Sequence, residues 1–200
     1  MRVTIMSDDL VRELALADKI VSRKVTIPVL SNVLVVAGKD GVTLSATDTE
    51  CSLQARIRGD VHENGKTTVN AARLHELVRT LPQAPIRLET DDQSLKLSGA
   101  GFEFKARLQT LPSDDFPPIP IVAETDAVMS LPRTVLREMI QRVRFACTVE
   151  DKRYFLAGAQ LEVQSQVVRM VSSDGHRLAV TECAHATGAV TQRDKDDNET

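Results

Sequence analysis

The feature that most constrains the fold of this 200-residue chain is an internal repeat with a fixed offset of 126 residues. The matched pairs cover two helix positions, one strand position and one turn position: Leu10 and Leu136, Leu14 and Ile140, Leu44 and Met170, Asp48 and Asp174. An offset that stays constant through helix, strand and turn indicates duplication of a folding unit. The chain is therefore expected to contain copies of one unit.

Hydrophobic periodicity predicts that each copy is a strand, a helix and three strands. In the first copy, Ser7 or Asp8 is expected to cap the helix. The predicted elements of that copy are a strand at 2–6, a helix at 7–20 and strands at 29–37, 41–46 and 51–57. Asn70 is expected to cap the helix of the second copy, whose strands are predicted at 66–69, 86–89, 94–97 and 102–108. Helices on one side of antiparallel sheets give an α+β fold class.

A third copy begins after a boundary at residues 111–120, where four prolines in ten residues exclude a helix or a central strand. Its helix is predicted at 132–145, with Leu136, Ile140 and Val143 on the apolar face. Its strands are predicted at 127–131, 153–163, 167–172 and 176–183. The expected domains are residues 1–122 with two copies and residues 123–186 with half of a second domain. The charged tail at 187–200 is predicted to be disordered.

Composition excludes several classes of protein. The cysteines Cys51, Cys147 and Cys183 are odd in number and widely spaced, which favours a reducing cytosol over a disulfide framework or a zinc site. The chain has no run of 18 apolar residues and no apolar signal segment at its start, which argues against a membrane protein or a secreted one. A cytoplasmic location is therefore expected.

The charge distribution leaves two interpretations open. The net charge of −3 argues against a nucleic acid partner, but the predicted helix at 132–145 carries four arginines and one glutamate. Those arginines are either a solvated helix face or a set of weak phosphate contacts.

No motif predicts catalysis, a metal site or a cofactor. Ser173, Asp174 and His176 lie too close together on a predicted hairpin to converge as a catalytic triad. The chain also lacks GxSxG, Walker and HExxH motifs. Asp48 is predicted to hydrogen-bond the backbone of its turn.

Two runs, Arg153-Tyr-Phe-Leu-Ala-Gly158 and Ser173-Asp-Gly-His-Arg-Leu-Ala179, resemble the central domain of the bacterial DNA polymerase III β subunit, the replication sliding clamp. A third run, Arg23–Asn32, resembles the start of the same family, so the resemblance covers almost the whole chain. It implies a DNA-clamp fold, with helices on the inner face and antiparallel sheets outside. Family members continue through a third domain, so the chain is expected to be an N-terminal fragment.

The resemblance also implies three groups of site residues. The residues of the partner-peptide groove are Arg153, Phe155, Ser173, Gly175, His176, Arg177 and Leu178. Those expected to contact duplex DNA are Lys24, Arg73, Arg137, Arg142, Tyr154 and Phe155. Lys24 stands where the family more often has arginine, and Phe155 where some members have tyrosine. Arg73 and Leu108 are expected at the interface with a second subunit.

The resemblance implies a non-catalytic processivity subunit of DNA polymerase III. Its implied partners are duplex DNA, the DNA polymerase III alpha subunit, the clamp loader, other proteins with a clamp-binding motif, and a second copy in a closed ring. Two alternatives remain at this point. One is a peptide-binding module of the same fold without a DNA role, and the other is a hydrolase centred on Asp174 and His176.

Overall fold

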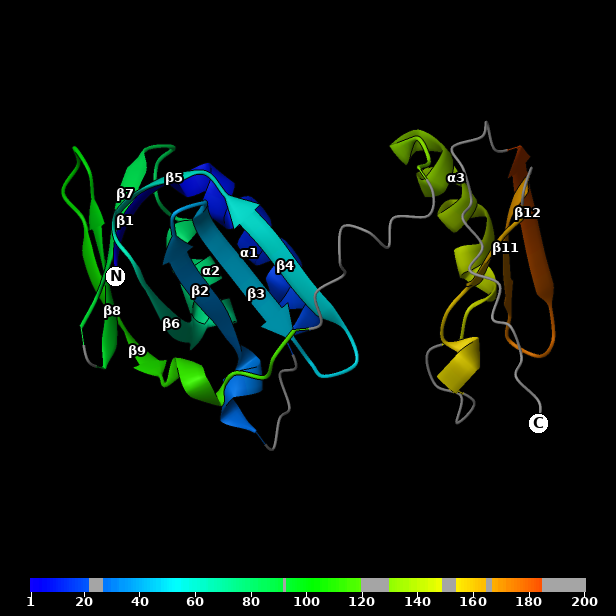
Figure 1. The fold of residues 1–200 in the computed structure, drawn as a ribbon, viewed down its shortest axis with the longest axis horizontal. Coiled ribbons are helices and arrows are strands. Elements are labelled where there is room, and N and C mark those ends of the chain that lie inside the picture. The colour runs from blue at the N-terminus through cyan, green and yellow to red at the C-terminus, as the bar shows by residue number, and fades with distance from the viewer. Residues whose placement is uncertain (22–26, 92, 120–129, 149–153, 165–166, 185–200) are drawn as a thin grey trace, which may run out of the picture. The chain divides into compact units, whose positions relative to one another are not determined.

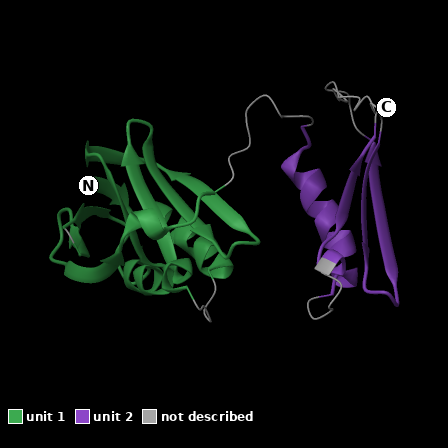
Figure 2. Ribbon diagram, turned by 60° about the horizontal axis from the view of Figure 1, so that its bottom comes forward, with its two compact units in different colours: residues 1–121 green, residues 122–200 purple. Residues whose placement is uncertain are grey.

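The computed structural model describes residues 1–21, 27–91, 93–119, 130–148, 154–164 and 167–184. The chain divides into two compact units, residues 1–121 and residues 122–200, shown in different colours in Figure 2. The elements of each unit are labelled in Figure 1 where there is room.

The described residues of unit 1 form two α-helices and nine strands. In chain order they are β1 (Arg2–Met6), α1 (Ser7–Ile20), β2 (Asn32–Gly38), β3 (Gly41–Thr47), β4 (Ser52–Ile57), β5 (Gly59–Glu63), β6 (Gly65–Asn70), α2 (Ala71–Val78), β7 (Pro85–Thr90), β8 (Ser94–Gly99) and β9 (Lys105–Leu111). Short 3-10 helices lie at Pro28–Ser31 and Ser113–Asp115.

The nine strands form one antiparallel sheet in the order β4-β3-β2-β6-β9-β8-β7-β1-β5. The strands β6 and β9 pair only through Thr68 with Leu111 and Val69 with Thr110. Helices α1 and α2 pack together, and in Figure 1 they lie behind β2, β3 and β4. The apolar core between helices and strands includes Val3, Leu10, Leu14, Val33, Val35, Leu44, Leu74, Leu88 and Leu97. The predicted α+β class with antiparallel sheets is thus confirmed.

The described part of unit 2 contains the helix and the three following strands of one copy of the repeat. Its elements are α3 (Arg133–Val143), a 3-10 turn at Arg144–Ala146, a second 3-10 turn at Tyr154–Leu156, β10 (Gln160–Val163), β11 (Val167–Ser173) and β12 (Leu178–Ala184). The three strands are antiparallel, with β11 in the centre. Helix α3 packs on β11 and β12 through Met139 and Val143.

The start of α1 differs from the predicted cap, because the Ser7 side chain binds the backbone of another segment and not that of its own helix. Met6 is the N-cap residue of α1, and no side chain caps the helix. The buried Ser7 hydroxyl instead donates to the Pro82 carbonyl at 2.6 Å and accepts from the Ala84 amide at 3.2 Å. It therefore ties α1 to the segment before β7. Asn70 does cap α2, because its Oδ1 accepts from the Arg73 amide at 3.0 Å.

Several strand boundaries also differ. The run predicted as a strand at 29–37 begins as a 3-10 turn, and the predicted strand at 102–108 begins only at Lys105. The run at 153–163 is extended only from Gln160, because Tyr154–Leu156 forms a 3-10 turn. Strand β5, which pairs with β1, was not predicted. The strand expected at 127–131 and the tail at 187–200 fall mainly or wholly outside the described residues.

The 126-residue offset is present in the coordinates as well as in the sequence. Strand β3 spans 41–47 and β11 spans 167–173, so the two are offset by 126 at both ends. Leu44 and Met170 are both buried, as the prediction required. Helix α1 spans 7–20, and α3 with its 3-10 extension spans 133–146, again offset by 126 at both ends.

One predicted core residue is not buried. Ile140 was placed on the apolar face of α3, but its side chain is 45% exposed, whereas Leu14, 126 residues earlier, is 0% exposed. Leu161 and Val163 of β10 behave in the same way: they are 45% and 37% exposed. Their counterparts Val35 and Ala37 are buried. In unit 1, α2 packs on α1 and β6 pairs with β2, and no described residue of unit 2 takes these two places. The apolar positions are therefore repeated in unit 2, but its described residues contain no equivalent of the helix α2 and the strand β6 that bury them in unit 1.

Candidate functional site

The hairpin between β11 and β12 is held by the side chains of Ser173 and Asp174. Asp174 Oδ1 accepts hydrogen bonds from the backbone amides of His176 and Arg177, both at 3.0 Å. Its Oδ2 accepts from Arg177 Nε at 2.8 Å. Ser173 Oγ accepts from the Gly175 amide at 3.1 Å and donates to the Arg177 carbonyl at 2.9 Å. Gly175 has φ of 87°, a conformation that glycine adopts readily.

These contacts rule out the arrangement that a hydrolase would need at this hairpin. Asp174 binds the backbone amide of His176, and no contact joins its carboxylate to the imidazole. The hydroxyl of Ser173 is engaged with the Arg177 carbonyl and is not paired with a base. Within the described ranges, moreover, no group of three or more His, Cys, Asp or Glu side chains could hold a metal ion.

The same turn is built a second time in unit 1. Asp48 Oδ1 accepts from the amides of Glu50 at 3.0 Å and Cys51 at 2.6 Å. Thr47 Oγ1 accepts from the Thr49 amide and donates to the Cys51 carbonyl, both at 3.0 Å. Thr49 has φ of 81°, where its counterpart is Gly175. Asp48 therefore binds the backbone of its turn as predicted. Both copies of the repeat share this backbone geometry, so it is not specific to the turn in unit 2.

The hydrogen bonds to Asp174 favour its ionised form. The amides of His176 and Arg177, followed by the Arg177 guanidinium, lower the pKa of Asp174 to about 2. Because the folded-state pKa lies below the ordinary value, the carboxylate contributes stability above about pH 4, and this is lost as the pH falls toward the folded-state pKa. We expect the amide resonances of His176 and Arg177 to titrate with a midpoint near pH 2 in NMR spectra. A midpoint near the ordinary Asp value of about 4 would contradict these contacts, and Asp174→Asn should abolish the titration.

What distinguishes the unit 2 turn is its side chains. The Arg177 guanidinium lies over the ring of Phe145, with its Cζ atom 5.3 Å from the ring centroid. Leu178 is 66% exposed at the start of β12, and His176 and Gly175 are exposed as well. Of the other predicted groove residues, Phe155 is exposed in the 3-10 turn at Tyr154–Leu156, and Arg153 lies outside the described residues.

The exposed face of α3 carries arginines at several positions. Arg133, Arg137 and Arg144 are exposed; Arg133 and Arg137 lie one turn apart on α3, and Arg144 begins the 3-10 turn that follows the helix. None of the three forms an ion pair with a residue in the described part of the chain. Arg142 differs, because its guanidinium is 2.5 Å from the Glu138 carboxylate one turn earlier. The structure thus adds Arg133 and Arg144 to the candidate phosphate contacts and weakens the case for Arg142.

The remaining predicted DNA contacts are only partly described. Lys24 lies outside the described residues, and Tyr154 is described only as the first residue of a 3-10 turn. Arg73 is exposed at the start of α2 and lines a cleft of about 780 Å³ between β6 and β9.

The predicted subunit interface falls on β9. The edge of β9 opposite β8 pairs with β6 only at Thr110 and Leu111, so residues 105–109 have no partner strand there within the described residues. Leu108 is half-buried against the core of unit 1. Arg73 and Leu108 both lie in this region of unit 1, but their role at an interface remains a prediction.

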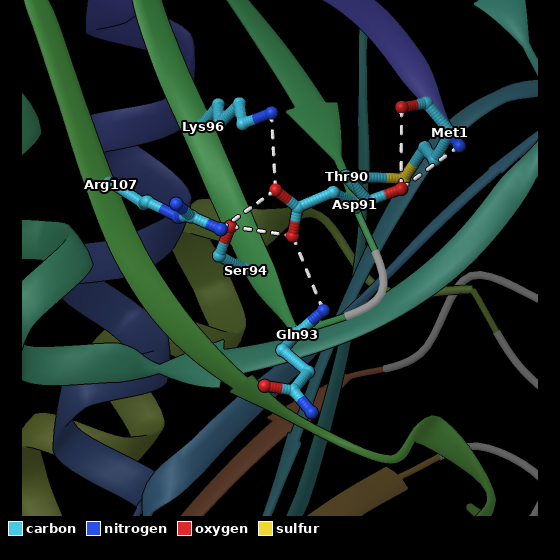
Figure 3. Close-up of polar contacts among 7 residues, drawn as sticks. All are labelled: Met1, Thr90, Asp91, Gln93, Ser94, Lys96 and Arg107. Carbon is cyan, nitrogen blue, oxygen red and sulfur yellow. Dashed lines mark hydrogen bonds and ion pairs between the residues drawn. The ribbon is translucent and has the colours of Figure 1, made fainter.

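A polar cluster around Asp91 contacts β9 through Arg107, on the edge where β9 pairs with β8 (Figure 3). Asp91 Oδ1 accepts from Ser94 Oγ at 2.7 Å, and its Oδ2 lies 2.9 Å from Arg107 Nη2 and 3.1 Å from Lys96 Nζ. The Ser94 hydroxyl and the Lys96 ammonium hold the pKa of Asp91 well below its usual range. The cluster links the β7–β8 turn to β8 and β9, which keeps the open strand in place.

The duplicated strand–helix–three-strand unit, with all-antiparallel pairing, defines the DNA-clamp class of fold. Comparisons with known proteins agree. Residues 1–120 match the family model of the DNA polymerase III beta subunit, N-terminal domain, and residues 130–195 match that of its central domain. The chain belongs to the DNA polymerase III beta subunit family.

Individual relatives show the same similarity. The beta sliding clamp of Pseudomonas putida is 37% identical over 182 residues, covering 90% of this chain and 49% of the relative. That of Escherichia coli K12 is 30% identical over 182 residues, with the same coverage. A crystal structure of the Pseudomonas aeruginosa sliding clamp bound to griselimycin matches with a TM-score of 0.85 and 34% identity, covering 94% of this chain and 51% of that chain. The chain thus spans about half the length of these relatives.

Proposed function

We propose that this chain supplies the N-terminal domain (residues 1–122) and the first half of the central domain (residues 123–186) of a DNA polymerase III sliding clamp. The function is topological and non-catalytic: a closed ring encircles duplex DNA and tethers the polymerase, which raises the polymerase's effective concentration at the template. The observation that carries the proposal is the repeat of one folding unit with a constant offset, in a chain that matches both clamp domains. A cytoplasmic location follows from this role, and no described helix is long and apolar enough to cross a bilayer.

The DNA-facing surface is assigned to the exposed sides of the helices. Arg137, with Arg133 one turn earlier on α3 and Arg144 in the 3-10 turn that follows, is positioned to contact successive phosphates. Arg73 is exposed on α2, and Lys24, Tyr154 and Phe155 complete the proposed set. Phosphate contacts by scattered arginines carry no sequence information, which suits a protein that slides.

This DNA surface makes a quantitative prediction. Arg137→Ala should lower the slope of log K against log salt for duplex DNA by about 0.9, because one counterion-releasing contact is lost. Arg142→Ala should change the slope much less, since Glu138 already neutralises that guanidinium. The measurement is fluorescence anisotropy of a labelled duplex, titrated with the chain at several low salt concentrations.

Two outcomes of this titration would count against the proposal. Equal slopes for wild type, Arg137→Ala and a triple Arg133→Ala, Arg137→Ala, Arg144→Ala variant would show that α3 does not face DNA. A larger effect of Arg142→Ala than of Arg137→Ala would show that the helix presents its other side.

The surface around the β11–β12 hairpin is proposed as part of a groove for a linear peptide. Leu178, Arg177, His176, Gly175 and Ser173 are assigned to it, with Phe155 and Arg153 from the neighbouring segment. The proposed partners are the DNA polymerase III alpha subunit, the clamp loader and other proteins with a clamp-binding motif. Exposed Leu178 supplies the apolar contact that a short peptide needs as its anchor.

The open edge of β9 is proposed as the contact with a second subunit. An unpaired antiparallel edge offers backbone donors and acceptors to a strand of another chain. Arg73 and Leu108 lie beside this edge, so a homodimeric ring would be closed there.

A further inference from the structure

The two copies of the aspartate turn act as an internal comparison. Thr47 and Asp48 make the same backbone hydrogen bonds as Ser173 and Asp174. Whatever is special about the second turn must therefore come from side chains that the first turn lacks. The positions of Phe145, Arg177 and Leu178 are occupied 126 residues earlier by Lys19, Cys51 and Ser52. The second copy thus carries an aromatic ring, a cation and an aliphatic side chain where the first has a lysine, a cysteine and a serine.

Two of these three side chains, Phe145 and Arg177, are in contact with each other. Asp174 Oδ2 holds Arg177 Nε at 2.8 Å, and the guanidinium lies over the Phe145 ring at 5.3 Å. The Phe145 ring is 55% exposed and is not part of the apolar core of unit 2. Leu178 follows Arg177 directly and is exposed. The turn and the end of α3 are also joined, because buried Ser172 donates to the Val143 carbonyl at 2.6 Å. Phe145 and Arg177 are thereby fixed relative to each other.

We propose that Phe145 is a further contact residue of the peptide groove, and that Asp174 is a positioning residue that holds Arg177 against the Phe145 ring. This inference rests on the proposed peptide-binding function of the hairpin. The ring of Phe145 and the aliphatic stem of Arg177 form one wall, which takes an apolar side chain of a linear peptide.

The local charge favours a peptide over a nucleic acid at this wall. The Asp174 carboxylate pairs with Arg177 Nε and offsets the charge of the guanidinium, which makes Arg177 a weaker ligand for a phosphate than an unpaired arginine. What remains available is the apolar stem of Arg177 and the open part of the Phe145 ring. An arginine already fixed by a carboxylate and a ring loses little further side-chain entropy when a ligand packs on it.

The test is an NMR titration of the isotopically labelled chain with a synthetic linear peptide carrying a clamp-binding motif. Phe145→Ala and Asp174→Asn are each expected to raise the Kd by about tenfold, the size of a moderate hot-spot residue. Asn at position 174 can still accept from the amides of His176 and Arg177, but its amide group cannot hold the guanidinium.

The first turn provides matched controls. Asp48→Asn makes the same chemical change in the same backbone geometry, and Lys19→Ala truncates the position equivalent to Phe145. Both should change the Kd by less than about twofold, because neither residue contributes a side chain to the wall. The Arg177 Nε–H resonance should also shift in Asp174→Asn and stay unchanged in Asp48→Asn.

The outcomes separate the inference from the function on which it rests. If Leu178→Ala weakens peptide binding while Phe145→Ala and Asp174→Asn do not, the inference is overturned and the groove stands. If wild type shows no chemical-shift change on the hairpin, the groove itself is overturned. An Asp48→Asn effect equal to that of Asp174→Asn would show that the turn aspartates act only through folding, which also overturns the inference.

Discussion

Leu14→Ala is expected to lower the free energy of unfolding of unit 1 by about 3–5 kcal/mol, the range for a fully buried leucine that leaves a cavity. The side chain of Leu14 is 0% exposed on α1, the helix that packs against α2 and the sheet. The repeat supplies a matched control. Ile140→Ala removes the equivalent side chain from unit 2 but should cost less than about 1 kcal/mol, because a side chain already in contact with water leaves little cavity.

The two effects must be measured separately, since a chain with two units need not unfold in one step. Hydrogen exchange followed by mass spectrometry resolves them, because the slowest amides of β2 and β3 report on unit 1 and those of β11 and β12 report on unit 2. A loss of protection for Ile140→Ala in unit 2 as large as that for Leu14→Ala in unit 1 would mean that Ile140 is covered in solution.

Gly99→Ala is expected to destabilise unit 1 by about 2–3 kcal/mol through overpacking. A Cβ atom at Gly99 would overlap the Phe102 carbonyl oxygen and lie 2.8 Å from the Phe102 ring. The backbone cannot move aside easily, because the Gly99 amide donates to the Phe104 carbonyl at 3.1 Å. The same measurement of hydrogen exchange, or urea unfolding followed by circular dichroism, detects the loss.

Gly38→Ala is the matched control for this prediction. Gly38 also ends a strand, and a Cβ atom there would meet nothing within 4 Å. Its substitution should change stability by less than about 0.5 kcal/mol. If both variants were equally stable, the turn from Gly99 to Phe104 would have to be looser than its contacts indicate.

Much of the fold could be predicted because its signals are local or repeated. Asn70 caps α2 through its own side chain, and the strands at 41–47 and 167–173 bury apolar residues at matched positions, Val42 and Leu44 in one and Val168 and Met170 in the other. Other features depend on partners distant in sequence. Ser7 looked like a helix cap, but its hydroxyl is taken by Pro82 and Ala84, some 75 residues away. Strand β5 has no strong pattern of its own and forms because β1 offers an edge.

The candidate site divides in the same way. The aspartate turn at 173–178 could be predicted from the Asp-Gly signal and from its copy at 47–52. The weakened role of Arg142 was visible in principle, because Glu138 precedes it by one helical turn. Phe145 could not be found from sequence, since only the fold brings Arg177 to its ring. Ile140 was misjudged because periodicity tells which side of a helix is apolar, and not whether another element covers it.

The exposure of Ile140, Leu161 and Val163 has a consequence for handling the protein. The equivalent side chains of unit 1 are buried in its core. In unit 2 these apolar side chains are exposed to solvent. Exposed apolar side chains of this kind promote aggregation as the solution is concentrated. Preparations of residues 1–200 should therefore be kept dilute. Leu161→Glu is a rational way to improve their solubility, because Leu161 lies on β10 and not on the face of α3 proposed to contact DNA.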